Sequence, residues 1–306
     1  MSVIATKLSE EYETATGIEY PRKRPEITKA EEKVDASSER NTLDGGQWVD
    51  PELMLKWALE QVEYEGEYPW DDLPETSQAT ERGRALRDIE VYEIVEQVYG
   101  DHIRENKTDR NAIAGLANVM FNRALAVEVC KDMGHAAEIY VKVRQLLEGD
   151  KELGARELAA RAALNGSICW YITGNIEQTI KDIEFAVEQY RELVKKRPIV
   201  RFLKNTSTSL MNKSIILDHN GRQDEALESM HEATGVTEEL LKVEASDNSW
   251  NQMGFVQLNL GLALHRRGQY NEAMDALIQA WDIYEMLLDR ANRYDYAACY
   301  SNACVY

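Results

Sequence analysis

From about residue 109 to the end of the chain, apolar residues recur at spacings of three and four, which places them on one face of an α-helix. No stretch of this region alternates apolar and polar residues as a half-buried strand does. Only Pro198 follows Pro74, and a proline inside a helix breaks it. The pattern therefore predicts an all-α array over residues 109–306.

The segment before this array carries signals for two more helices. Pro51 directly follows Asp50, and Asp as N-cap with Pro at the first helical position is a favourable helix start. A stretch with two prolines ends this pattern, and a second helix is expected over about residues 78–103. We expect these helices to form a cap pair within residues 47–108.

The first part of the chain differs from the rest. Residues 1–46 contain two prolines and many charges, and they show no apolar periodicity. Segments of this composition bury too little apolar surface to offset the entropy of ordering. We therefore predict a disordered N-terminal tail over residues 1–46.

Three segments of the array are near copies of one another. Each has an Asn, a Gly nine residues later, and a Thr or Ala five residues further on: Asn165/Gly174/Thr179, Asn212/Gly221/Ala226 and Asn259/Gly268/Ala273. The copies are 47 residues apart, since 212 − 165 and 259 − 212 both equal 47. Self-similarity at a fixed period predicts stacked repeats, each of which buries its apolar face against its neighbours.

Each copy is predicted to be a helix, a tight turn and an antiparallel helix. The Gly suits a left-handed conformation at the end of the first helix. Small residues recur where two helices would approach closely, and a bulky residue follows on the first helix, so small and large side chains can interdigitate. The small residues are Ser167, Ser214 and Gly261 on the first helices and Ala186, Ala233 and Ala280 on the second, and the bulky ones are Trp170, Leu217 and Leu264.

These residues resemble the tetratricopeptide repeat (TPR). The copy around Asn259 matches the family pattern best, with Gly261, Leu264, Gly268, Tyr270, Ala273 and Ala280 in the family's order. The resemblance covers about residues 161–306 and extends weakly to about 111, where Gly134 stands 12 residues after Asn122. The usual repeat has 34 residues, whereas this one has 47, and its longer second helices resemble the extended repeats of the kinesin light chain. The resemblance implies a right-handed α-solenoid over residues 109–306 with an incomplete last repeat.

The resemblance also implies a binding groove along the first helices. In the family, the residues that face the concave groove lie at offsets −4, −1, 0, +3, +6 and +7 from the position of the repeated Asn. The groove residues predicted in this way are Asn165, Ile168, Tyr171, Asn212, Ile215, His219, Asn259, Leu262, Arg266 and Asn302.

The repeated Asn is the residue whose chemistry fits this groove. An Asn side chain has a donor and an acceptor, so it can pair with the backbone amide of a bound peptide of any sequence. Neighbouring apolar residues such as Leu164, Met211 and Leu258 would add side-chain pockets. In the alternative interpretation, each Asn only bonds a neighbouring helix or an ordered water.

Composition narrows the choice of partner. The net charge is −19, which disfavours nucleic acid and anionic membranes and favours a basic partner segment, although acidity also simply keeps a protein soluble. No stretch approaches the roughly 18 apolar residues of a membrane helix, and the N-terminus lacks a secretory signal. The four cysteines form no CxxC pair and are expected to be reduced and buried, so we predict a cytoplasmic protein.

No catalytic chemistry is visible in the sequence. The five histidines show no metal-ligand spacing, and GxSxG, Walker, HExxH and GxGxxG motifs do not occur. We therefore expect no enzyme activity, no cofactor and no metal site. The predicted function is a protein–protein interaction scaffold that binds a peptide or protein segment in its groove. The alternative is a structural or regulatory arm of a longer protein, with an apolar C-terminal end that contacts another chain or further repeats.

Overall fold

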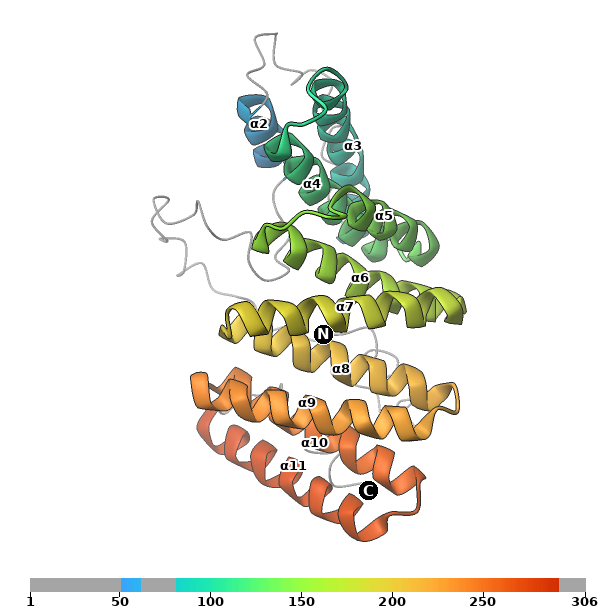
Figure 1. Cartoon of the computed structure of the whole chain (residues 1–306), viewed down its shortest axis with the longest axis vertical. Helices are drawn as coiled ribbons and strands as arrows, with labels where there is room; N and C mark the ends of the chain where they lie inside the picture. The colour runs from blue at the N-terminus through green and yellow to red at the C-terminus, as the bar shows by residue number, and fades with distance from the viewer. Residues whose placement is uncertain (1–50, 62–80, 292–306) are drawn as a thin grey trace. The chain divides into compact units, whose positions relative to one another are not determined.

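The structure, a computed structural model, describes residues 51–61 and 81–291 (Figure 1). The chain divides into two units, Met1–Gln47 and Trp48–Tyr306, and every described residue belongs to the second. The tail predicted over residues 1–46 lies outside the described residues, and so does the predicted C-terminal repeat fragment with Asn302.

Every element in the described ranges is a helix, and each packs against the next along the chain. The predicted all-α array of antiparallel helix pairs is therefore confirmed (Figure 1). After α2 and α3, four pairs follow, in which α4, α6, α8 and α10 are the first helices and α5, α7, α9 and α11 the second. The helices are α2 (Pro51–Gln61), α3 (Glu81–Glu105), α4 (Arg110–Val129), α5 (Met133–Leu146), α6 (Leu153–Thr173), α7 (Ile176–Lys196), α8 (Val200–His219), α9 (Gln223–Val243), α10 (Asp247–Arg266) and α11 (Tyr270–Ala291).

The turns between paired helices use the predicted glycines. Gly174, Gly221 and Gly268 have φ angles of 82°, 76° and 75°, in the left-handed region that favours glycine. In the pair α4–α5, the corresponding residue is Lys131, with φ 67°. The sequence left the register of this unit open, and Gly134 does not mark the turn, because it lies in the first turn of α5.

Lys131 shows that this unit, the first of the four in chain order, has the same spacing as the others. It follows Asn122 by nine residues, and Ala136 follows it by five, as in the other three units. Asn122 therefore belongs to the same series as Asn165, Asn212 and Asn259. A non-glycine residue in the left-handed region is uncommon and costs some strain. Because this turn has Lys131 where the others have glycine, the glycine pattern did not identify it.

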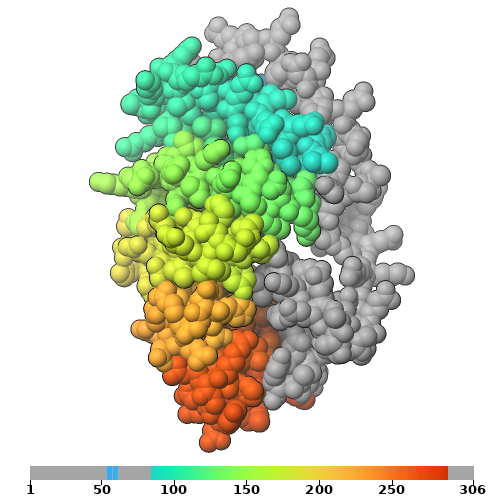
Figure 2. Space-filling model, turned by 90° about the vertical axis from the view of Figure 1, so that its right-hand side faces the viewer, coloured from blue at the N-terminus to red at the C-terminus, as the bar shows by residue number. Residues whose placement is uncertain are grey.

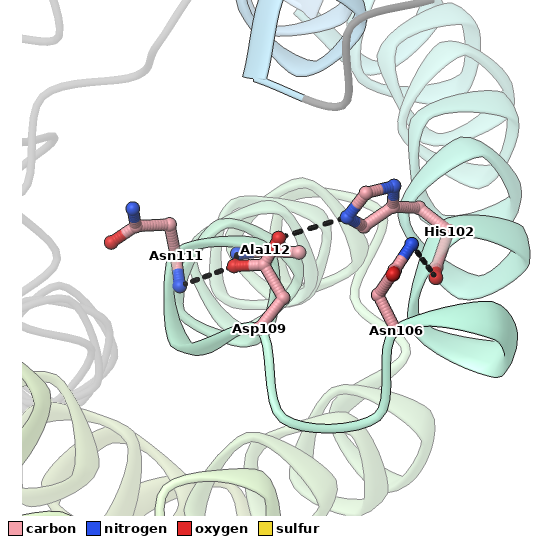
Figure 3. A network of polar contacts seen from close by, with 5 residues as sticks. All are labelled: His102, Asn106, Asp109, Asn111 and Ala112. Atoms are coloured by element: carbon pink, nitrogen blue, oxygen red, sulfur yellow. Dashed lines mark hydrogen bonds and ion pairs between the residues drawn. The ribbon is translucent and has the colours of Figure 1, made fainter.

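The junction of α3 with α4 is fixed by a small polar network (Figure 3). Asp109 caps α4, because its Oδ1 accepts hydrogen bonds from the backbone N–H groups of Asn111 (2.9 Å) and Ala112 (3.1 Å). Its other oxygen lies 2.8 Å from Nε2 of His102, near the end of α3. The N–H of Ala112 and then His102 hold the pKa of Asp109 below its usual value.

Helix pairs approach closely at the predicted small residues. Ala186, Ala233 and Ala280 are fully buried on the second helices. A Cβ atom on Gly261 would lie 2.7 Å from Cγ of Leu277, which is closer than carbon atoms pack. Small residues at these positions are therefore required by the distance between the helices.

Charged side chains link successive second helices. A guanidinium nitrogen of Arg144 on α5 pairs with Asp182 of α7, whose side chain is only 2% exposed. Further along, Arg191 of α7 donates to Glu232 of α9, with its Nε 2.7 Å from Oε1. These ion pairs connect one repeat with the next on the side of the array that the second helices form.

One helix departs from the sequence prediction about membrane-like segments. By length and composition, α4 is apolar enough to cross a membrane, which the sequence analysis did not anticipate. Most of it is buried, and it packs against α3, α5 and α6. Its apolar surface is therefore used in the core of the array.

Candidate functional site

The repeated Asn residues occupy one register on the four first helices, at Asn122, Asn165, Asn212 and Asn259. Asn122 and Asn212 are 6% and 7% exposed, and the other two are half-buried. We call the surface made by these four residues and the predicted groove residues of α6, α8 and α10 the first-helix face. It is the candidate site.

The four Asn side chains differ in their hydrogen bonds. The Nδ2 of Asn122 donates to the backbone oxygen of Asn118 (2.9 Å), within its own helix. The Nδ2 of Asn259 likewise donates to the backbone oxygen of Phe255 (2.8 Å) and lies 3.6 Å from Sδ of Met211 on α8. The amide of Asn212 forms no hydrogen bond with any described residue, and its atoms are not among the buried polar atoms that lack a partner, so they are accessible to solvent.

Asn165 is part of a network that reaches back to the preceding unit. Its Nδ2 donates to Oη of Tyr140 on α5 (3.2 Å), and that hydroxyl donates to Oε1 of Glu128 on α4. Burial raises the pKa of Glu128, and the hydrogen bonds from Tyr140 and Cys169 oppose this effect. The interpretation that an Asn bonds its surroundings thus applies in part, since Asn122, Asn165 and Asn259 use their Nδ2 groups internally.

The predicted residues at the ends of the first helices meet in pairs. The hydroxyl of Tyr171 on α6 forms a hydrogen bond with Nδ1 of His219 on α8, and their ring centroids are 5.9 Å apart. Asp218 of α8 forms an ion pair with Arg266 on α10. In both pairs, the residue at offset +6 of one unit meets the residue at offset +7 of the next.

The centres of the first helices carry the apolar part of the site. Ile168, Ile215 and Leu262 are half-buried, so each keeps part of its side chain accessible. They lie three residues after Asn165, Asn212 and Asn259, and residues three apart are neighbours on a helix surface. Each Asn amide in these three units therefore has an aliphatic side chain beside it.

Charge divides unequally between the two kinds of helix. The four first helices contain eight Lys and Arg against four Asp and Glu. The four second helices contain eight Lys and Arg against 17 Asp and Glu. The acidity of the chain thus lies largely on the second helices, and the net charge of −19 does not describe the first-helix face.

One residue of this site, Asn122, was not among the groove residues predicted from the sequence. The register of Asn122 stayed open, because Gly134 stands 12 residues after it and no glycine marks the turn at Lys131. The signal that was present is the 14-residue spacing from Asn122 to Ala136, which equals that from Asn165 to Thr179.

No group of three His, Cys, Asp or Glu side chains suited to a metal ion occurs among the described residues.

The comparisons with known proteins agree with this fold. The family model described as Tetratricopeptide repeat matches residues 256–293, which cover most of α10 and all of α11. No curated protein matches the chain in sequence. The predicted resemblance to tetratricopeptide repeats is confirmed at this segment.

Solved structures extend the likeness to most of the chain. BtubC (BKLC) from P. vanneervenii is 15% identical, with a TM-score of 0.51, and the match covers 78% of this chain and 92% of that one. The second is a point variant of TPR-like repeats of a kinesin light chain type from Podosopora anserina, whose own repeats are nearly identical to one another. It is 16% identical to this chain, with a TM-score of 0.50, and the match covers 77% of this chain and 96% of that one. At these identities the match shows the fold, which is of a type that commonly mediates protein–protein interaction.

Proposed function

We propose that the protein is a non-enzymatic interaction scaffold whose first-helix face binds an extended segment of a partner protein. The observation that carries the proposal is the series of four Asn amides at one register, among which Asn212 has no hydrogen-bond partner in the described part of the chain. The amide atoms of Asn212 are not among the buried polar atoms that lack a partner, so they are accessible, and a ligand backbone could supply a donor and an acceptor in place of water.

The other Asn residues can contribute through their amide oxygens. Asn122, Asn165 and Asn259 donate through Nδ2, and their Oδ1 atoms accept no hydrogen bond among the described residues. A carbonyl oxygen of this kind accepts a backbone N–H from an extended peptide. The spacing by whole repeats would let one ligand chain meet several amides in turn.

The charges of the site bear on what the ligand is. The first-helix face has no acidic excess, because Asp218 is paired with Arg266 and Glu128 is hydrogen-bonded to Tyr140. Selection of a basic segment, which the net charge predicted, is therefore not favoured at this face. We propose recognition through the ligand backbone and through apolar side chains that contact Ile168, Ile215 and Leu262. A cytoplasmic location stays a prediction.

A peptide selection tests this proposal. Random peptides displayed on phage are selected on the immobilised full chain, and the affinities of the enriched peptides are measured by calorimetry. Asn212→Ala should weaken their binding by about 1–3 kcal/mol, because the peptide group that paired with the amide loses its partner. Asn271→Ala, on α11, is the matched control and should leave the affinity unchanged.

Two results would count against the proposal. One is an enriched peptide that binds Asn212→Ala as tightly as the unmodified chain. The other is selection that yields no binder, which would favour the alternative of a structural or regulatory arm without a free peptide ligand.

A further inference from the structure

The last described helix exposes a row of large apolar side chains. Tyr270, Met274 and Ile278 of α11 are 65%, 52% and 50% exposed. They are spaced by four residues, so they lie along one side of the helix. We call these three residues the α11 stripe. The helix belongs to the red end of the chain in the space-filling view (Figure 2).

The place of Met274 is covered on two other second helices. At the 47-residue register, Met274 corresponds to Leu227 of α9, which is half-buried and packs on the cluster that contains Val256 and Leu260 of α10. Further back it corresponds to Ile180 of α7, which packs on the cluster that contains Ile216 of α8. The position of Met274 is therefore one at which this array elsewhere receives another helix, whereas His231 and Glu184, the equivalents of Ile278, are exposed and polar.

An acidic border runs beside the stripe. Asp275, Asp282 and Glu285 are exposed, and they lie three residues before, four after and seven after Ile278. These offsets place them on the same side of the helix as Ile278. None of the three forms an ion pair with a described residue. By contrast, α7 has four basic residues beside its five acidic ones, and Arg191 and Lys195 of that helix form ion pairs. The whole of α11 has five acidic residues and one basic one.

We propose that the α11 stripe docks a basic amphipathic helix of a partner protein. The apolar side of such a helix would cover Tyr270, Met274 and Ile278, and its Lys and Arg side chains would pair with the acidic border. A second copy of this chain packed α11 against α11 would bring two acidic borders together, and like charges in contact are repulsive. Charge complementarity thus favours a basic partner over self-association.

The probe for this proposal is a synthetic helical peptide of Leu and Lys, about 18 residues or five helical turns long, with all Leu on one side. The control peptide has the same composition in an order that forms no apolar side. Binding to the full chain is measured by fluorescence anisotropy at low and high salt. The amphipathic peptide should bind at least about tenfold more tightly than the control, and high salt should weaken it.

Variants locate the binding surface. Met274→Ser with Ile278→Ser should weaken the amphipathic peptide about tenfold, whereas Val243→Ser, at an exposed apolar position of α9, should not change it. Asp275→Asn, Asp282→Asn and Glu285→Gln together should remove most of the salt dependence. The matched control removes three exposed charges from α9 instead, with Glu228→Gln, Glu238→Gln and Glu239→Gln.

The outcomes separate this proposal from its competitors. Equal binding of the two peptides, or equal effects of the α9 and α11 charge variants, would overturn it. A lower melting temperature of the Met274→Ser/Ile278→Ser variant than of Val243→Ser would mean that the chain itself covers the stripe, which also overturns it. So would sedimentation showing a dimer that this double variant abolishes. Asn212→Ala should bind the peptide normally, so failure here is distinct from failure of the first-helix face.

Discussion

The first and second helices of this array form two surfaces that differ in their balance of acidic and basic residues. Second helices are joined by ion pairs, including the buried pair Arg144–Asp182 and the more exposed pair Arg191–Glu232. First helices also meet through ion pairs, Arg201 with Glu157 and Arg266 with Asp218, and through the hydrogen bond between Tyr171 and His219. They also hold the Asn series, on helices where basic residues outnumber acidic ones.

This difference teaches that one net charge does not describe both surfaces. Acidic residues outnumber basic ones about twofold on the second helices, 17 against 8, whereas the ratio is reversed on the first helices, 4 against 8. The basic partner that the overall charge predicts fits the acidic border of α11. The first-helix face offers amides and aliphatic side chains instead.

The largest effect is expected at the buried ion pair between second helices. Asp182→Ala should lower the free energy of unfolding by about 3 kcal/mol, because it leaves the guanidinium of Arg144 in a mostly buried place without its partner. Urea unfolding followed by circular dichroism measures the loss. The matched control is Asp224→Ala, which breaks the pair with Arg267 at a side chain that is 88% exposed. The comparison fails if both variants lose the same stability, since an exposed pair contributes only about 0–1 kcal/mol.

A smaller loss is expected where the two kinds of helix pack together. Ala273 is buried at the start of α11, and its backbone oxygen is among the atoms nearest to Gly261 of α10. Ala273→Leu should destabilise the array by about 1–3 kcal/mol through overpacking. Gln279→Leu, at an exposed position of the same helix, is the control and should change little. An unchanged melting curve for Ala273→Leu would show that α10 and α11 do not meet closely there.

The smallest effect is expected at the contact between first helices. Tyr171→Phe removes the hydroxyl that bonds His219 and should cost about 0.5–1.5 kcal/mol in unfolding free energy. The same urea titration measures it. A loss as large as that of Asp182→Ala would mean that this exposed hydrogen bond contributes as much stability as the buried ion pair, contrary to the order expected from their burial.

Much of the fold could be predicted from the sequence, because left-handed turns favour glycine and close helix contacts require small residues. The same rule failed at Lys131, where the chain adopts positive φ without glycine, and so the sequence left the register of the first TPR-like unit open. The hydrogen bond from Asn165 to Tyr140 could not be predicted, since it depends on how closely α5 of the preceding unit approaches α6. The unequal charge of the two surfaces was present in the sequence and needed only the helix boundaries to be seen.

The central claim is that the amide of Asn212 pairs with the backbone of a bound segment. The most direct measurement is the nuclear magnetic resonance signal of its side-chain NH₂ group, assigned by its loss in Asn212→Ala and followed as a selected peptide is added. We predict that the Asn212 signal shifts until the site is saturated, whereas the side-chain signal of Asn271 on α11 stays in place. If the peptide binds while the Asn212 signal does not move, the account of the first-helix face is wrong.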